Sequence, residues 1–137
     1  MGDSGAYFLS FFTGFILIEI YNANLKISPY FIILLLWYPC FETLFSIIRK
    51  LLKKKSALKP DNDHLHQLIF ILIKNRYQFK NLPANIITGI LINTFNLILL
   101  YSGSLNPYNT IIQLKLIITA TLSYMIIYIL IKKSLNK

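Results

Sequence analysis

Two histidines and two aspartates lie within one short polar stretch of the chain. His64 and His66 stand in Lys59-Pro-Asp-Asn-Asp-His-Leu-His-Gln-Leu68, which also holds Asp61 and Asp63. A protonated imidazole can donate hydrogen bonds to phosphate oxygens, and nearby lysines raise the local concentration of anions. On a helix, residues i and i+2 diverge by about 200°, so both rings can meet one ligand only where the backbone is extended or turned. Taken by itself, the pair favours a solvated loop over a functional site.

A second polar motif, Met1-Gly-Asp-Ser-Gly5, directly precedes an apolar segment. A serine nucleophile at Ser4 is disfavoured, because it would need a strand-turn-helix elbow or a β-barrel, with partners upstream. Asp3 or Ser4 can instead cap the free N–H groups of a helix N-terminus. Asp3 can also give one oxygen ligand to Mg²⁺, with a nucleotide diphosphate and water completing the shell. The capping and magnesium interpretations both remain open.

Glu42 is an ionisable residue well inside an apolar segment, three positions after Pro39. A charge at membrane depth is costly, so Glu42 should face the protein interior or a wet cavity. The alternative is a structural hydrogen bond to backbone groups that Pro39 leaves free. Glu19 and Lys115 fit structural roles. The single cysteine, Cys40, is expected to be a small buried hydrophobic residue. With one cysteine and two histidines, neither a disulfide framework nor a tetrahedral zinc site is expected.

The composition is that of a membrane protein. Of the 137 residues, 55% are hydrophobic and 14% are charged, and the mean hydropathy is +0.58. A soluble domain carries roughly a quarter charged residues. The net charge of +9 does not indicate nucleic acid, because the basic residues flank apolar segments and few aromatics are placed to stack bases.

Four apolar segments predict an all-α fold with four transmembrane helices. They cover about residues 6–24, 29–48, 82–101 and 108–131. The second should kink at Tyr38-Pro39, because proline removes a helix hydrogen bond. Residues 1–137 thus form one transmembrane region, with a long polar loop, 49–81, between the second and third spans.

Twelve of the fourteen basic residues fall on one side of this arrangement. They are Arg49, Lys50, Lys53, Lys54, Lys55, Lys59, Lys74, Arg76, Lys80, Lys132, Lys133 and Lys137. Lys26 lies on the other side, and Lys115 lies within the fourth span. By the positive-inside rule, the loop and both termini face the cytoplasm. The Met1–Gly5 motif and the histidines therefore share a compartment.

The loop 49–81 has two parts. Residues 49–59 are basic. They either rest on anionic lipid headgroups or only fix the orientation of the chain in the membrane. Residues 63–76 are apolar, but too short and too flanked by charge for a span. A short interfacial helix is expected there, with a re-entrant segment as the alternative.

Three motifs together carry a family resemblance. They are Met1-Gly-Asp-Ser-Gly-Ala-Tyr-Phe-Leu9, Tyr38-Pro-Cys-Phe-Glu-Thr-Leu-Phe-Ser-Ile-Ile-Arg-Lys50 and Lys59-Pro-Asp-Asn-Asp-His-Leu-His-Gln-Leu68. In this combination, the chain resembles the C-terminal part of the polyprenyl-phosphate N-acetylhexosamine-1-phosphate transferases (glycosyltransferase family 4), which are bacterial integral membrane enzymes. The resemblance covers residues 1–70 by motif and the last two spans by position only.

The resemblance implies transfer of a sugar-1-phosphate from a UDP-N-acetylhexosamine to undecaprenyl phosphate, with release of UMP, in cell-wall or surface polysaccharide synthesis. It matches Asp3 to the metal-binding aspartate of the family's Gly-Asp-x-Gly motif, with Mg²⁺ or alternatively Mn²⁺ as the cofactor. It matches His64 and His66, with Gln67 beside them, to a cytoplasmic His-x-His loop that is implicated in diphosphate and metal-site binding. The implied location is the bacterial inner membrane.

The sequence departs from the family at several positions. Gln67 stands where many members have a further His, and Asn62 where many have Arg. Either change removes a positive or donor group near phosphate, although Gln67 can still donate. The family's paired aspartates and Asp-Gly nucleotide-binding loop lie upstream of Gly-Asp-x-Gly, outside this sequence. We therefore expect a C-terminal fragment that is catalytically inactive by itself.

Two other classes of protein compete with this interpretation. One is a non-catalytic four-helix membrane protein that binds anionic lipid or a partner through its lysine-rich loop. The other, which the sequence favours least, is a piece of a transporter or channel that uses Glu19, Glu42 and Lys115 as intramembrane polar groups.

Overall fold

The computed structural model describes residues 3–52, 54 and 63–135. Every helix or strand assigned in these ranges is an α-helix, so the all-α prediction is confirmed for the described part of the chain. The order is α1 (Asp3–Ala23), α2 (Pro29–Leu35), α3 (Trp37–Leu52), α4 (Leu65–Tyr77), α5 (Asn81–Ser104) and α6 (Thr110–Leu135). Most of the lysine-rich run lies outside the described residues, as do Asp61 and Asn62, so its predicted lipid contact stays a prediction.

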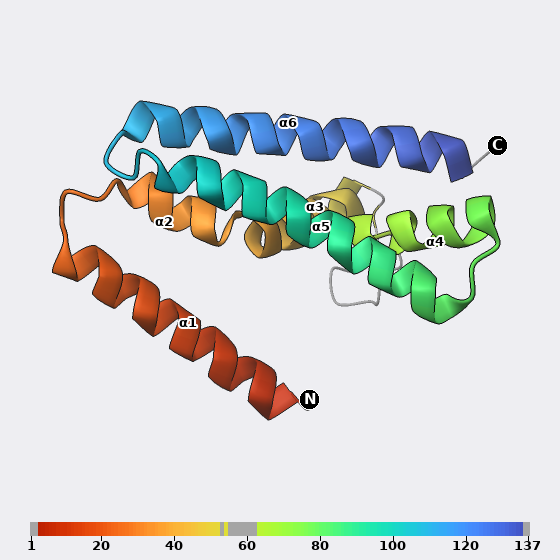
Figure 1. Ribbon diagram of the computed structural model, residues 1–137, viewed down its shortest axis with the longest axis horizontal. Coiled ribbons are helices and arrows are strands. Elements are labelled where there is room, and N and C mark those ends of the chain that lie inside the picture. The colour runs from red at the N-terminus through yellow and green to blue at the C-terminus, as the bar shows by residue number, and fades with distance from the viewer. Residues whose placement is uncertain (1–2, 53, 55–62, 136–137) are drawn as a thin grey trace.

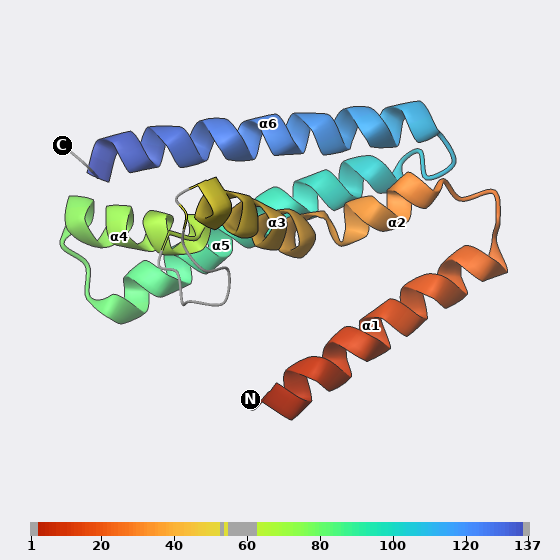
Figure 2. The same cartoon turned by 180° about the vertical axis from the view of Figure 1, so that it is seen from behind.

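The long helices α5 and α6 run antiparallel along the molecule (Figure 1). α2 packs beside one end of this pair and α4 beside the other, with α3 between them. α1 packs on α2 and diverges from the other helices in both views (Figures 1 and 2). Its aromatic side chains, such as Tyr7 and Phe11, are largely exposed. The bundle of α2 to α6 therefore holds the core, and α1 projects from it.

The four predicted spans fall on these helices. By length and composition, α5, α6 and the part of α1 from Ser4 could each cross a membrane. The pair α2 and α3 meets the same criterion together, but its two members bend by 74°. The described residues thus contain three candidate spans, or four if the bent pair counts as one. α4 lies within the predicted loop 49–81 and packs against both α5 and α6, and its place at a membrane interface stays a prediction.

The break between α2 and α3 has a local cause. If one helix continued, Pro39 would lack a hydrogen bond, and its ring would collide with the carbonyl of Leu35. The chain instead leaves the helix at Leu36, whose φ is −103° and ψ 8° and whose N–H donates to the Ile33 carbonyl at 3.2 Å. Pro39 then lies in the first turn of α3, where proline is tolerated. The predicted kink is confirmed, slightly before the proline.

The turn after α1 and the turn after α5 meet at one end of the molecule. The Ser28 N–H donates to the Pro107 carbonyl at 2.9 Å, and the hydroxyls of Ser28 and Thr110 lie 3.0 Å apart. The charge count places both turns opposite the basic loop, and a shared end is what that arrangement requires. The side of the membrane on which they lie stays a prediction.

Aromatic side chains of α3 and α6 form the centre of the core. Tyr124 lies edge-on to Phe41 and Phe45, with ring centroids 5.0 and 5.5 Å apart. Phe45 also meets Tyr128 edge-on at 4.9 Å. Such pairs contribute about 0.5–1.5 kcal/mol each beyond the burial of their area. This packing sets the rotation of α3 about its axis, and thus the direction in which Glu42 points.

The same rotation overturns one prediction. Cys40, expected to be buried, is exposed on α3. It lies two positions before Glu42, which is about 200° around a helix. Because Glu42 faces the core, Cys40 faces outward.

Candidate functional site

The carboxylate of Glu42 connects three helices. Its Oε1 atom accepts hydrogen bonds from Nδ1 of His64 at 3.0 Å and from the Leu65 backbone N–H at 3.1 Å. Its Oε2 atom accepts one from the Tyr124 hydroxyl at 2.7 Å. The Glu42 side chain is only 10% exposed, so these donors replace water around a buried charge. Glu42 therefore faces the interior as predicted, and its three donors come from outside the region of Pro39.

The sequence of α3 explains how a carboxylate comes to lie there. Glu42, Ser46 and Arg49 are all buried, at spacings of four and three positions, so they share one face of the helix. The guanidinium carbon of Arg49 lies 5.5 Å from the ring centroids of both Phe45 and Tyr128, which is cation–π geometry. α3 thus buries a polar face with a negative and a positive charge about two turns apart.

The two histidine rings lie together because the backbone is extended where α4 begins. His64 is the N-cap residue of α4, with φ −69° and ψ 146°. Its ring stacks on that of His66, with centroids 5.6 Å apart and planes 17° from parallel. This is the backbone condition that the sequence analysis required for a shared ligand. With Nδ1 bound to Glu42, Nε2 of His64 is the nitrogen left for such a ligand.

Asp63 is tied to the end of α6 just before this turn. Lys132 Nζ donates to Asp63 Oδ2 at 3.0 Å and to the Tyr128 hydroxyl at 3.2 Å. Both side chains of the ion pair are about one-third exposed, at 34% for Asp63 and 32% for Lys132. The pair holds the chain that enters α4, while the Glu42 carboxylate holds the first residues of the helix itself.

His66 and Gln67 line a cavity of about 750 Å³ against α5, whose wall is mostly apolar but carries several polar side chains. The polar residues that α5 contributes to it are Asn81, Asn85, Thr88 and Asn93. Gln67 Oε1 is buried and accepts no hydrogen bond within the described structure. Sequence analysis missed the α5 residues. Their recurrence about once per helical turn in an apolar segment was the signal that could have found them.

The structure does not bring Asp3 to this site. α1 begins at Asp3, apart from α4 in both views (Figures 1 and 2), and the Asp3 side chain lies outside the described residues. Within the described ranges, no group of three or more His, Cys, Asp or Glu could hold a metal. The histidines offer nitrogen, whereas Mg²⁺ prefers oxygen ligands. A cation at Asp3 therefore stays a prediction from the resemblance.

Comparison with known proteins supports a transferase. Over 67 residues, the chain is 36% identical to a probable undecaprenyl-phosphate N-acetylglucosaminyl 1-phosphate transferase of Bacillus subtilis (strain 168). The match covers 48% of this chain and only 19% of that relative's length. No family model and no solved structure matches the chain. Together with the apolar helices, the similarity supports a multi-pass membrane protein related to sugar-phosphate transferases.

Proposed function

We propose that His64, held by Glu42, binds phosphate in the active site of a membrane sugar-phosphate transferase. The reaction moves N-acetylhexosamine-1-phosphate from a UDP-sugar to undecaprenyl phosphate. An oxygen of the lipid phosphate bonds to the β-phosphorus, and the bond from that phosphorus to the bridging oxygen breaks, so UMP leaves with the bridging oxygen. The name of the Bacillus subtilis relative supports the acceptor and the sugar phosphate. The UDP-sugar donor rests on the resemblance alone.

The observation that carries this proposal is the bond of 3.0 Å between Glu42 and Nδ1 of His64. A carboxylate on one ring nitrogen sets the orientation and tautomer of an imidazole, and directs the other nitrogen at a ligand. The ligand would meet that nitrogen at the N-terminus of α4, where the helix dipole favours an anion. Phosphoryl transfer depends on positioning and on neutralising charge at the phosphoryl oxygens. A fixed His64 ring that donates a hydrogen bond from Nε2 to a phosphoryl oxygen would supply both.

The cavity beside His66 is proposed to hold the sugar. Side-chain amides both donate and accept hydrogen bonds, which suits the hydroxyl and N-acetyl groups of an N-acetylhexosamine. Gln67, Asn85 and Asn93 supply such amides in this cavity. A site that hydrogen-bonds its ligand rejects analogues that lack the matching group, because buried polar atoms are then left unpaired. These residues are therefore candidates for sugar selection.

The divalent cation is given no step in this proposal. Asp3 would hold Mg²⁺ or Mn²⁺ by the resemblance, and the cation would neutralise phosphate charge. The described residues offer no such site by themselves, so we assign His64 and His66 to phosphate oxygens. The proposed setting is the cytoplasmic face of the bacterial inner membrane, where a soluble nucleotide sugar meets a lipid headgroup.

The test uses a chimera in which this chain replaces the matching segment of the Bacillus subtilis relative. The chimera is reconstituted in vesicles with undecaprenyl phosphate, and the release of UMP from UDP-N-acetylglucosamine is measured. We expect turnover by the chimera and none by the 137-residue chain alone. His64→Ala should lower kcat by about 10²–10³-fold, the range seen when one transition-state donor is removed. His66→Ala should lower it less, because its ring has no carboxylate partner in the described structure.

A matched control is Glu19→Gln, which removes an exposed carboxylate of α1. Its rate should equal that of the unmodified chimera. A chimera that folds but releases no UMP would contradict the proposal, as would full activity after His64→Ala.

A further inference from the structure

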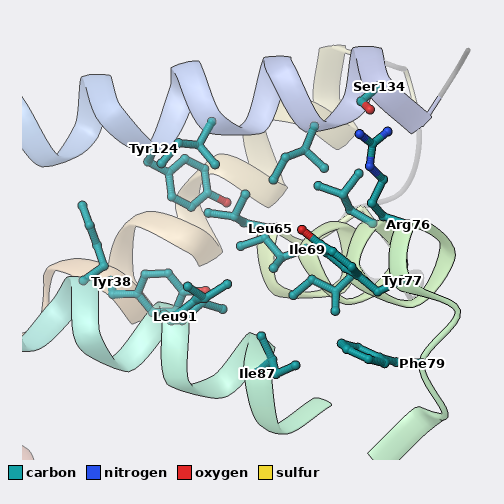
Figure 3. Close-up of a pocket in the computed structure, with 16 residues that line it drawn as sticks. Tyr38, Leu65, Ile69, Arg76, Tyr77, Phe79, Ile87, Leu91, Tyr124 and Ser134 are labelled. Atoms are coloured by element: carbon teal, nitrogen blue, oxygen red, sulfur yellow. The ribbon is translucent and has the colours of Figure 1, made fainter. Parts of the chain in front are cut away.

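A second cavity, of about 980 Å³, lies between α4, α5 and α6 (Figure 3). Tyr38 and Tyr124 line one end, and Arg76 and Ser134 line the other. The volume lies near the upper end of the range of about 300–1,000 Å³ for sites that take small organic ligands. The cavity shares Tyr38 and Ile92 with the cavity beside His66, but it lacks the asparagines of α5 that line that one.

The wall of this second cavity is apolar except near its ends. Aliphatic residues from all three helices cover it, including Ile69, Ile87, Leu91 and Ile131. Among the described residues that line it, Arg76 is the one with a full charge. No ion pair to Arg76 occurs within the described part of the chain. Figure 3 shows its guanidinium beside Ser134, at one end of the cavity. The matching ligand has a long apolar body and an anionic head.

We propose that this cavity binds an anionic glycerophospholipid, with a fatty-acyl chain between the three helices and the phosphate on Arg76. A guanidinium can hold a phosphate through two parallel hydrogen bonds, and the Ser134 hydroxyl can add a third. Two exposed lysines stand next in sequence to residues that line the cavity, Lys80 after Phe79 and Lys133 before Ser134. Each basic residue near an anionic membrane surface adds attraction for anionic lipid.

The charge of Arg76 favours an anionic lipid over an apolar protein segment as the occupant of this cavity. A helix that filled the cavity with aliphatic side chains would cover Arg76 without offering it an anion, which costs desolvation of a charge. A zwitterionic lipid would bring its own cation next to the lysines. An anionic lipid satisfies both the apolar wall and the basic end.

The proposed lipid is distinct from the reacting acceptor. Arg76 lies twelve positions after His64 on α4, which is about 18 Å along the axis at about 1.5 Å per residue. A phosphate bound at Arg76 is therefore out of reach of the His64 ring. The lipid would instead join α4 to α5 and α6, and stabilise the protein by mass action. This inference does not depend on the transferase proposal.

The test measures which lipid the purified full chain retains. The protein in a nonionic detergent is given equal amounts of phosphatidylglycerol and phosphatidylcholine, and bound lipid is counted by native mass spectrometry. We expect about a five-fold preference for phosphatidylglycerol, the effect of one well-placed basic group. Arg76→Gln should remove the preference. The matched control Lys74→Gln, which changes an exposed lysine of the same helix that does not line the cavity, should keep most of it.

Two further measurements distinguish lipid binding in this cavity from nonspecific lipid binding and from binding of the acceptor lipid. Leu91→Trp places a large ring in the cavity wall, and should lower the retention of both lipids. Undecaprenyl phosphate at equal concentration should not displace phosphatidylglycerol. Equal retention of the two phospholipids, the same result for Arg76→Gln and Lys74→Gln, or displacement by undecaprenyl phosphate would each overturn the proposal.

Discussion

At the N-terminal end of α4, the Glu42 carboxylate has three donors within the protein, whereas at the C-terminal end Arg76 has no ion-pair partner in the described structure. Glu42 is 8% exposed, and Arg76 lies at the protein surface. The protein thus holds one end of the helix by its own hydrogen bonds, and the other end is where we propose that a lipid binds. Substitutions should therefore destabilise the free protein at the first end, and act through the ligand at the second.

The largest effect is expected from Glu42→Ala. It leaves the Tyr124 hydroxyl, the Leu65 N–H and Nδ1 of His64 without their acceptor, so we expect a loss of about 3 kcal/mol in the free energy of unfolding. Glu42→Gln keeps one acceptor oxygen and should cost about 1 kcal/mol. Denaturant titration in detergent, followed by circular dichroism, measures both. If Glu42→Ala were as stable as the unmodified chain, the Glu42 carboxylate would not stabilise the N-terminal end of α4.

Tyr124→Phe is the next largest. The substitution keeps the ring that packs on Phe41 and Phe45 but removes a hydrogen bond to a buried carboxylate, which contributes about 1.5–3 kcal/mol. The same titration measures the loss. Tyr108→Phe is the control, because that side chain is 58% exposed, and it should change the free energy by less than about 0.5 kcal/mol. Equal losses in the two variants would show that Tyr124 acts through its ring alone.

Asp63→Asn should have a smaller effect. Its ion pair with Lys132 is about one-third exposed on each side, and such pairs contribute roughly 0.2–1 kcal/mol. The contribution should shrink in 1 M salt, where charges are screened over about 3 Å. If Asp63→Asn lowered the free energy of unfolding as much as Glu42→Ala, and salt did not change this loss, the ion pair rather than the Glu42 carboxylate would be the main interaction that holds α4.

Arg76→Gln should have the smallest effect on the lipid-free protein, within about 0.5 kcal/mol, because the side chain is exposed. Added phosphatidylglycerol should then raise the melting temperature of the unmodified chain more than that of the variant. Thermal unfolding with and without the lipid measures this difference. Strong destabilisation by Arg76→Gln without lipid would remove the contrast between the two ends of α4.

Local sequence patterns were enough to predict the helices. The predicted spans 82–101 and 108–131 correspond to Asn81–Ser104 and Thr110–Leu135, because apolar runs of this length bounded by turn residues favour helices wherever they pack. The kink near Pro39 followed from a missing N–H. The requirement for an extended backbone at the histidine pair followed from the helical period. Each of these depends on residues within one continuous stretch of the chain.

Only the tertiary structure decided what the polar side chains meet. Glu42 and His64 are 22 positions apart, and Glu42 and Tyr124 are 82 apart. No local period links such residues, because their contact depends on how α3 is rotated and on where α4 and α6 cross it. The aromatic packing of α3 on α6 sets that rotation, turning Glu42 inward and Cys40 outward. The sequence by itself predicted an inward-facing acid and a polar stretch with two histidines, and the packing of three helices is what brings Glu42 against His64 and Tyr124.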